Sequence, residues 1–424
     1  MSVLRRVLAA FAFAIATATL AGAQSTAPPT SPQGPAPVTP ALVAPFPTPA
    51  PHVEIDDEGE RNDRPKKRSQ RDDLTGWAYA SKGLQFRSEG GGLYQYFSLR
   101  NQFRFTSEQD DEEWAVNRSR LKFGGHLWSP RVSNFVEIDL KTPRAYHFFV
   151  QVKARDWLQV RAGQWKVEFN RERVDSSGDQ QLVDRSLVNR DFTLDGQLGV
   201  MARGRVLKGR RFDGEYFLGV LAGEGRLALG DGDGVPMVLG RYQWNVFGRS
   251  VGFSQSDVEY HPKPAMAIGV AAVSNRGRFT RFSSDGGAQL SGFETGAAGR
   301  YDLRQWMVDM ALFNRGFSLQ TEQHWKHVRD RETAVERRLF GGYVLAGYFP
   351  HDRWRAIPAA LEFAGRVAYA DPDRDAAVPI DREITGGINW YFNQHRNKLN
   401  LDVSRLTIQG ATHGRVRLQW EISI

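Results

Sequence analysis

Apolar and polar side chains alternate along most of the chain after residue 76. The last ten residues show this most simply, because one side carries Val416, Leu418, Trp420, Ile422 and Ile424 and the other carries Arg415, Arg417, Gln419, Glu421 and Ser423. Successive side chains of a strand point to opposite faces, so this period predicts a strand with one apolar and one wet face. The alternation recurs in about sixteen segments, with roughly 22 residues for each strand and its connection, and a spanning strand needs only ~9–11 of them.

A chain that ends within a strand whose outer row is apolar is typical of a barrel that closes on its first strand, because closure leaves no free edge. The composition agrees, since the mean hydropathy is −0.47 although aromatic residues make up 12% of the chain and 42 residues are glycine. The continuous apolar runs that buried strands of a soluble α/β enzyme would show are missing. We therefore predict an all-β protein whose residues 76–424 form a 16-stranded antiparallel transmembrane β-barrel with a polar lumen.

The first residues fit an export signal. Arg5 and Arg6 precede a short apolar core at 7–20, and small residues just before Gln24 fit the cleavage rule. The core is too short to span a membrane as a helix, and no later stretch reaches eighteen apolar residues. The sequence thus predicts a signal peptide over residues 1–23.

The residues between the signal and the barrel favour a disordered periplasmic segment over 24–75. Ten of the chain's 20 prolines lie in 24–51, and residues 54–73 mix opposite charges densely. Such compositions form extended or solvated chain rather than a packed core. A plain linker and an arm that contacts the cell wall are both compatible with this composition.

One connection stands out by its length. About thirty polar residues, 167–196, separate two alternating segments, far more than a hairpin needs. They hold four arginines among seven carboxylates, with Phe169 and Phe192 as apolar anchors. A segment this polar cannot enter lipid, where its backbone groups would stay unsatisfied. We expect it to fold into the lumen and to narrow the pore near Arg173 and Arg185, with Arg171 close by.

The charge of the chain points to anions. The formal net charge is +8 at pH 7. The alternation turns a set of strand arginines toward the lumen: Arg100, Arg104, Arg118, Arg120, Arg161, Arg203 and Arg241. Rings of cationic side chains select anions in pores, and arginine offers forked donors to phosphate or carboxylate. The alternative is that these side chains only keep the lumen wet, or that basic groups meet anionic lipid.

The sequence predicts no catalytic residue, no metal site, no cofactor and no nucleic-acid partner. Neither GxSxG nor HExxH occurs, and the histidines are scattered. A barrel used as an outer-membrane anchor or enzyme is the alternative from a different class, but such an enzyme would need a Ser/His pair at the barrel rim. We therefore expect a passive channel.

Four stretches resemble the phosphate-selective porin O/P family: RAGQWKVEFNRERVDSSGDQQLVDRSL, LGVMARG, RGFSLQTE and ITGGINWYFNQHRNKLNLDVSRL. The resemblance runs from about Gly83 to Ile424. It implies a homotrimer of 16-stranded barrels in the bacterial outer membrane, in contact with its lipid. It also implies a third extracellular loop folded into the lumen and an arginine ladder that conducts small inorganic anions or other small solutes.

The resemblance also carries over to single residues. Arg185 resembles the family's constriction arginine, Ser176 resembles its anion-binding loop serine, and Arg118 fits one of its paired ladder arginines. The chain departs from the family where Arg173 replaces a lysine of phosphate-selective members and where Asn117 replaces the partner of Arg118. A further departure is Asn101-Gln102 in place of a glycine pair, and another is the final residue, Ile424, in place of an aromatic residue. These departures leave open a general small-solute diffusion porin without phosphate selectivity.

Overall fold

The computed structural model describes residues 75–80, 82–227 and 235–424. The predicted signal peptide (1–23) and nearly all of the predicted disordered segment (24–75) lie outside these ranges. Nowhere in the described ranges is there a helix with the length and apolar content needed to cross a membrane.

The described chain is built almost entirely of strands. They are β1 (Gly76–Ala80), β2 (Gly83–Arg87), β3 (Tyr94–Glu108), β4 (Asp111–His126), β5 (Val132–Asp139), β6 (Arg144–Arg155), β7 (Leu158–Lys166), β8 (Gly196–Val206), β9 (Gly214–Leu221), β10 (Met237–Asn245), β11 (Ala265–Gly277), β12 (Arg281–Ser283), β13 (Gly286–Ala288), β14 (Tyr301–Asn314), β15 (Phe317–Asp330), β16 (Glu336–Tyr348), β17 (Leu361–Asp371), β18 (Asp381–Asn393), β19 (Asn397–Ile408) and β20 (Ala411–Ser423). Four short helical turns are η1 (Glu89–Gly91), α2 (Arg171–Val174), α3 (Asn189–Phe192) and η2 (Pro350–Asp352).

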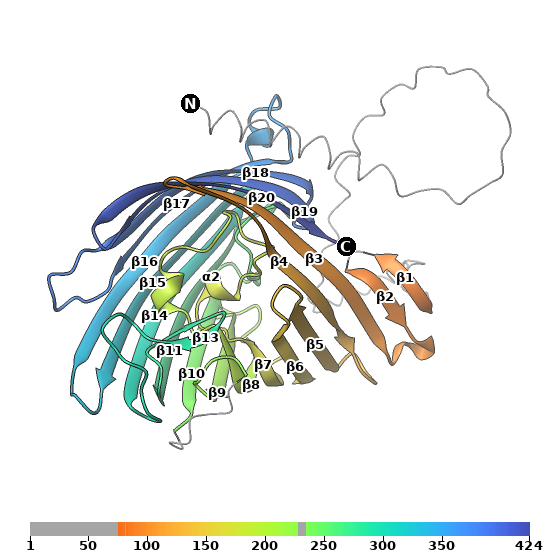
Figure 1. The fold of residues 1–424 in the computed structure, drawn as a ribbon. Helices are drawn as coiled ribbons and strands as arrows, with labels where there is room; N and C mark the ends of the chain where they lie inside the picture. Colours follow the sequence, from red (N-terminus) through yellow and green to blue (C-terminus); the bar gives the residue numbers. More distant parts are fainter. Residues whose placement is uncertain (1–74, 81, 228–234) are drawn as a thin grey trace. The chain divides into compact units, whose positions relative to one another are not determined.

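Sixteen of these strands, β3–β11 and β14–β20, form a closed antiparallel barrel (Figure 1). Each pairs with its neighbours in sequence, and β20 pairs back with β3 from Arg415 opposite Glu108 to Ser423 opposite Arg100. Closure pairs the backbone groups of every barrel strand, which is what a wall in contact with lipid requires. The predicted 16-stranded all-β fold is confirmed.

The hairpin of β1 and β2 lies next to the last residues of β20, because β2 and β20 pair with successive parts of β3. Ile424 exchanges backbone hydrogen bonds with Leu99 at 2.8 and 2.9 Å, and β2 then pairs with the start of β3, where Leu84 lies opposite Phe97. Gly83 begins β2 at a φ of 92° in close contact with the carbonyl of Phe97, where a side chain would not fit. The hairpin therefore extends the barrel wall at the end that carries Ile424.

The two faces of the barrel strands have opposite polarity. In β14, Gln305 and Asp309 are buried inside, whereas Trp306 and Val308 are 49% and 36% exposed on the outside. Trp306 stacks on Trp325 of β15 with ring centroids 3.7 Å apart. Apolar side chains are thus exposed on the outside and polar side chains are buried inside, which is the reverse of the arrangement in a soluble sheet protein. This arrangement is typical of a wall between lipid and water.

Connections at the end of the barrel that carries Ile424 are mostly short, with two residues between β6 and β7 and two between β14 and β15. Two connections at this end are longer, residues 246–264 and 349–360. At the opposite end, the connections between β7 and β8 (167–195) and between β11 and β14 (278–300) are long. Counted from β3, the first of these is the third connection at that end, as predicted.

The polarity of the last strand predicts different tolerance at adjacent positions. Trp420 packs on Phe103 on the outer face, at 5.8 Å between ring centroids, whereas Gln419 accepts hydrogen bonds from Arg104 inside. We expect Trp420→Asp to destabilise the barrel by up to about 2 kcal/mol, because its charge would face lipid. Gln419→Asp keeps an acceptor beside Arg104 and should assemble. The yield of folded protein in outer-membrane fractions measures the assembly of both variants. Equal yields would show that the outer and inner faces of β20 are assigned wrongly.

Candidate channel constriction

The connection between β7 and β8, residues 167–195 and hereafter the inner loop, lies inside the barrel (Figure 1). Its apolar side chains Phe169, Leu182, Val188 and Phe192 are buried in the main apolar cluster. Inward side chains from distant strands hold its backbone: Lys326 of β15 donates to the carbonyl of Asp191 at 2.6 Å, Arg366 of β17 to that of Asp184 at 2.9 Å, and Lys398 of β19 to that of Gln180 at 2.6 Å. The predicted anchoring by Phe169 and Phe192 thus agrees with the structure.

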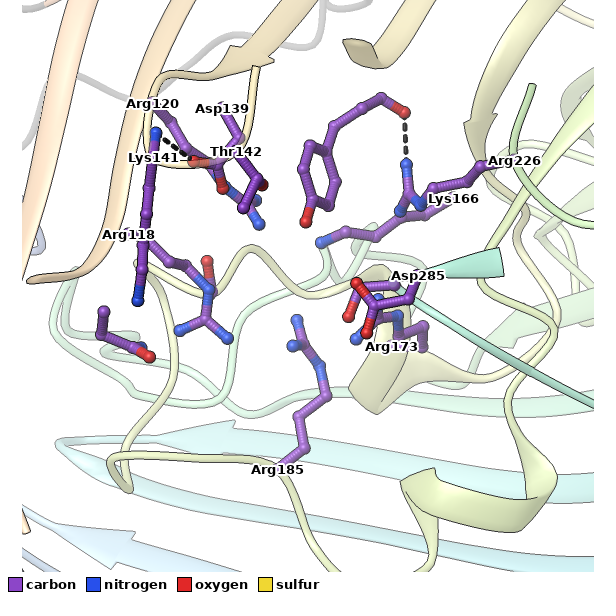
Figure 2. A pocket seen from close by; sticks show the side chains of 14 residues that line it. Arg118, Arg120, Asp139, Lys141, Thr142, Lys166, Arg173, Arg185, Arg226 and Asp285 are labelled. Carbon is purple, nitrogen blue, oxygen red and sulfur yellow. Dashed lines mark hydrogen bonds and ion pairs between the residues drawn. The ribbon is translucent and has the colours of Figure 1, made fainter. Parts of the chain in front are cut away.

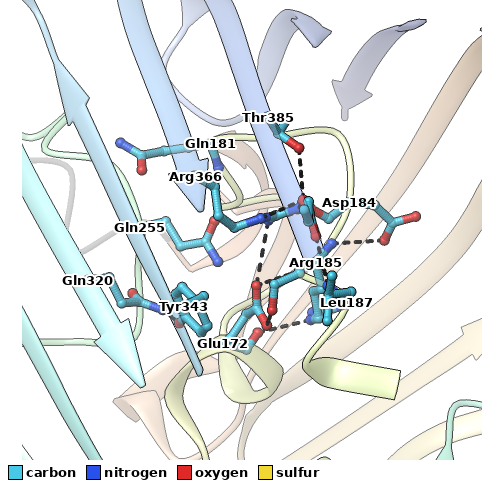
Figure 3. A network of polar contacts seen from close by, with 12 residues as sticks. Glu172, Gln181, Asp184, Arg185, Leu187, Gln255, Gln320, Tyr343, Arg366 and Thr385 are labelled. Atoms are coloured by element: carbon cyan, nitrogen blue, oxygen red, sulfur yellow. Dashed lines mark hydrogen bonds and ion pairs between the residues drawn. The ribbon is translucent and has the colours of Figure 1, made fainter. Parts of the chain in front are cut away.

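Arg185 is held by the backbone of the inner loop and not by a carboxylate. Its guanidinium donates to the carbonyl oxygens of Glu172 at 2.9 Å and Asp175 at 2.7 Å. The Glu172 carboxylate in turn accepts hydrogen bonds from the backbone N–H and the hydroxyl of Ser186 at 2.7 Å each, and it faces Arg366 at 3.6 Å (Figure 3). Burial and the neighbouring cations Arg173 and Arg118 lower the pKa of Arg185 to about 9, so the group stays charged at neutral pH.

A cavity of about 220 Å³ opens in front of Arg185. Figure 2 shows Arg118 of β4, Lys166 of β7 and Arg185 pointing toward this space from different sides. Arg118 donates to the amide oxygen of Gln102 at 2.8 Å, and Lys166 reaches the carbonyl of Asp175 at 3.4 Å. Within the described part of the chain, none of these three cations forms an ion pair. The cavity is thus lined by three basic side chains whose hydrogen-bond acceptors are neutral oxygens.

Three other cations at the cavity lie in ion pairs, two of them with the same carboxylate. Arg173 makes a forked contact to Asp195 at 3.0 and 2.5 Å, and Arg226 donates to the same carboxylate at 2.6 Å. Although burial opposes it, the guanidinium groups of Arg173 and Arg226 hold the pKa of Asp195 far below its usual value, so this carboxylate is charged. Arg120 pairs with Glu137 at 2.6 Å. Arg173, predicted at the narrowest point, does line the cavity, but with its charge paired.

The remaining predicted arginines differ in the hydroxyl and carboxylate groups that they contact. Arg100 donates to the hydroxyls of Ser176 at 2.9 Å and Ser177 at 2.7 Å and lies 3.9 Å from the carboxylate of Glu421. Arg104 pairs with Asp184 at 3.2 Å. Arg161 and Arg203 share Glu168, each at 2.9 Å, and Arg241 pairs with Asp309 at 2.5 Å. Most of these arginines thus lie beside a carboxylate, which Arg161 and Arg203 share.

Two predicted anion contacts lie away from the cavity. Arg171 is fully buried and donates to the carbonyl of Gly252 at 2.5 Å and to Gln243 at 3.1 Å. Ser176 accepts from Arg100, and it is the next residue, Ser177, that lines the cavity. Sequence reasoning placed both predicted residues in the correct loop without resolving the direction of their side chains.

A second cavity of about 270 Å³ lies on the other side of Arg185. Its wall includes Asp184, Glu383, Arg415 and Arg417 of the inner loop, β18 and β20. Arg185 is common to the linings of both cavities, so the side chain predicted at the constriction stands between them.

Sequence reasoning missed several residues at the first cavity, chiefly Lys166, Arg226, Ser177 and Tyr146. Lys166 follows Gln164 on the inner face of β7, and the alternation could have found it. Arg226 lies in the connection between β9 and β10 and reaches Asp195, 31 residues away in sequence, so no local pattern marks it. Among the described residues, no group of three or more His, Cys, Asp or Glu side chains is placed to hold a metal ion.

A closed 16-stranded barrel with a polar lumen and an inner loop is the architecture of a porin, a channel of the bacterial outer membrane. The model of the family described as phosphate-selective porin O and P matches residues 100–417. The chain belongs to this family, as the resemblance predicted.

Solved structures with the same fold are distant in sequence. The anion-selective porin from Comamonas acidovorans is 10% identical at a TM-score of 0.52, over 78% of this chain and 99% of that chain. OmpF of Salmonella typhi, in complex with daunomycin, is 10% identical at a TM-score of 0.51, over 79% and 99%. OmpT of Vibrio cholerae is 10% identical at a TM-score of 0.51, over 78% and 97%. These likenesses establish the fold only. No match was found among curated proteins.

Two buried acids should contribute stability to the folded state that is lost as the pH rises. Burial, partly opposed by Arg171, raises the pKa of Asp175 to about 7, and burial also raises that of Glu172 to about 7. Between about pH 4, the ordinary value of such groups, and pH 7, the folded protein holds protons that the unfolded chain has released. The contribution of these two acids to the free energy of unfolding should therefore fall as pH rises through this window.

Asp175→Asn, which imitates the protonated acid, should make this slope shallower, whereas Asp110→Asn in the exposed turn after β3 should not. Denaturant unfolding of the detergent-solubilised protein between pH 4 and 8 measures the slope. The same dependence on pH in wild type and in Asp175→Asn would refute the assignment.

Proposed function

We propose that the protein is an anion channel of the outer membrane in which Arg118, Lys166 and Arg185 bind a small anion in transit. The observation that carries the proposal is the cluster of three cations around the 220 Å³ cavity, none of which forms an ion pair in the described chain. Arg185 is buried and Arg118 and Lys166 are half-buried, so a passing anion can supply the charge partner that no carboxylate contact gives them.

The cavity faces the end of the barrel opposite Ile424. Thr142 from the connection after β5 and Ser284 from the connection after β11 contribute to its rim. In outer-membrane barrels the longer connections face the exterior, so an anion would enter this cavity from outside the cell. A liquid water molecule occupies about 30 Å³, so the cavity has room for an anion that keeps part of its hydration shell.

The fixed donors replace the water that the anion loses. Arginine forks and a lysine ammonium are suited to oxyanions, since the first donate in pairs and the second acts as a compact charge. The paired ladder arginines raise the local positive potential less than their number suggests, because Glu168, Glu137 and Asp309 offset them. Weak binding of this kind allows release as well as entry, which conduction requires.

Two names among the comparisons agree with this proposal: the family is described as phosphate-selective, and the Comamonas porin is described as anion-selective. Phosphate is therefore the first anion to test. The alternative, a general diffusion porin, would show no preference between anions and cations. The homotrimer, the signal peptide and the contact of the Pro-rich arm with the cell wall stay predictions.

Arg185→Ala should remove most of the preference for anions. Two unit charges 4 Å apart interact by roughly 4 kcal/mol at an effective dielectric constant near 20, against about 1 kcal/mol in bulk water, so a charge in a narrow pore counts strongly. The measurement is the reversal potential in a planar bilayer under chloride and phosphate gradients.

The matched control is Arg353→Ala, an exposed arginine of the connection after β16, which should behave as wild type because exposed charges are screened. Wild-type protein without anion preference, or an unchanged preference in Arg185→Ala, would remove the constriction assignment and leave a porin of unknown selectivity.

A further inference from the structure

A second connection enters the lumen, and it comes from the opposite end to the inner loop. It is the long connection between β10 and β11, and its residues 251–257 are here called the floor segment. Val251, Gln255 and Asp257 of this segment are 2%, 2% and 1% exposed. A surface connection does not bury its side chains to this extent. The floor segment is therefore part of the packing inside the barrel.

The floor segment touches the inner loop at two places. Arg171, the first residue of α2, donates to the carbonyl of Gly252 at 2.5 Å and to that of Val251 at 3.4 Å. The Arg171 guanidinium also lies 4.9 Å from the ring centroid of Phe253. Ten residues on, the backbone N–H of Gln181 donates to the side-chain oxygen of Gln255 at 3.1 Å.

Two wall residues bind both segments at once. Gln243 of β10 accepts from Arg171 at 3.1 Å and donates to the carbonyl of Val251 at 3.0 Å. Glu362 of β17 accepts from Ser256 at 2.8 Å and from the side chain of Gln181 at 2.7 Å. The two segments are thus fixed to each other directly and through the same wall groups.

The surplus of positive charge beside Asp309 explains why backbone carbonyls accept hydrogen bonds from Arg171. Arg171 and Arg241 both face Asp309, at 3.8 and 2.5 Å, so two buried guanidinium groups share one carboxylate. The surplus charge needs further acceptors, since a buried donor without a partner is costly. The carbonyls of Val251 and Gly252 supply them to Arg171, and that of Phe169 supplies one to Arg241 at 2.9 Å.

A short path connects these contacts to the constriction. The floor segment holds Arg171, Arg171 begins α2, and the carbonyls of Glu172 and Asp175 at either end of that turn hold Arg185. We propose that the floor segment is a second selectivity element, which sets the position of Arg185 through Arg171. Arg171 is then a positioning residue that never touches the anion, and the proposal rests on the proposed function of Arg185.

The test compares Arg171→Met, which keeps the bulk but removes the donors, with Arg249→Met. Arg249 belongs to the same connection but is exposed and bonds only to the carbonyl of Pro264 within the described contacts. We expect Arg171→Met to lower the anion-to-cation permeability ratio by about fivefold, the worth of roughly one net hydrogen bond at Arg185. Arg171→Lys, which can reach one carbonyl, should restore part of the ratio, and Arg249→Met should match wild type.

Thermal unfolding of each variant separates positioning from general damage. The proposal requires a lowered ratio in Arg171→Met in a barrel that still melts cooperatively and reaches the outer membrane. If Arg171→Met does not assemble, Gln255→Leu removes the second contact and must lower the ratio instead. An unchanged ratio in the assembled variant, or an equal loss in Arg249→Met, overturns the proposal. The proposed function fails separately, if wild-type protein shows no anion preference or if Arg185→Ala itself leaves the ratio unchanged.

Discussion

Pairing of inward guanidinium groups with carboxylates is the interaction on which the lumen depends. A barrel wall in lipid turns its polar side chains inward, so the charge of this chain collects there. Glu137, Glu168, Asp184, Asp195 and Asp309 each neutralise at least one arginine of the wall or the inner loop. Some of these carboxylates are shared by two guanidinium groups, as Asp195 and Asp309 are. The three cations at the first cavity differ from the rest because they bind only neutral oxygens, and they define the candidate constriction.

The inner loop contributes both Arg185 and groups that hold Arg185 in place. Four of the carboxylates involved in pairing or in holding the loop, Glu168, Glu172, Asp184 and Asp195, belong to the loop itself. Its backbone is fixed by lysines and arginines from β15, β17 and β19, and by the floor segment from the other end of the barrel. Segments distant in sequence therefore meet inside the wall, and the position of Arg185 depends on contacts from several of them.

The barrel could be predicted from the sequence because its pattern is local. A period of two with apolar residues outside marked the strands, and the length and polarity of 167–196 marked the inner loop. The pairing could not be predicted, because Arg226 meets Asp195 across 31 residues and Arg241 meets Asp309 across 68. For the same reason Arg171, a candidate for the anion site, could not be separated from Arg185, and the floor segment carried no pattern that distinguished it from a surface turn.

The most direct test of the account is the position of a bound anion. Bromide can be located in a crystal by its anomalous scattering, and diffraction from crystals soaked in bromide would show which cations it meets. The account predicts a site among the side chains of Arg118, Lys166 and Arg185. Bromide bound at the paired arginines, such as Arg161 and Arg203 beside Glu168, with none at Arg185, would contradict it.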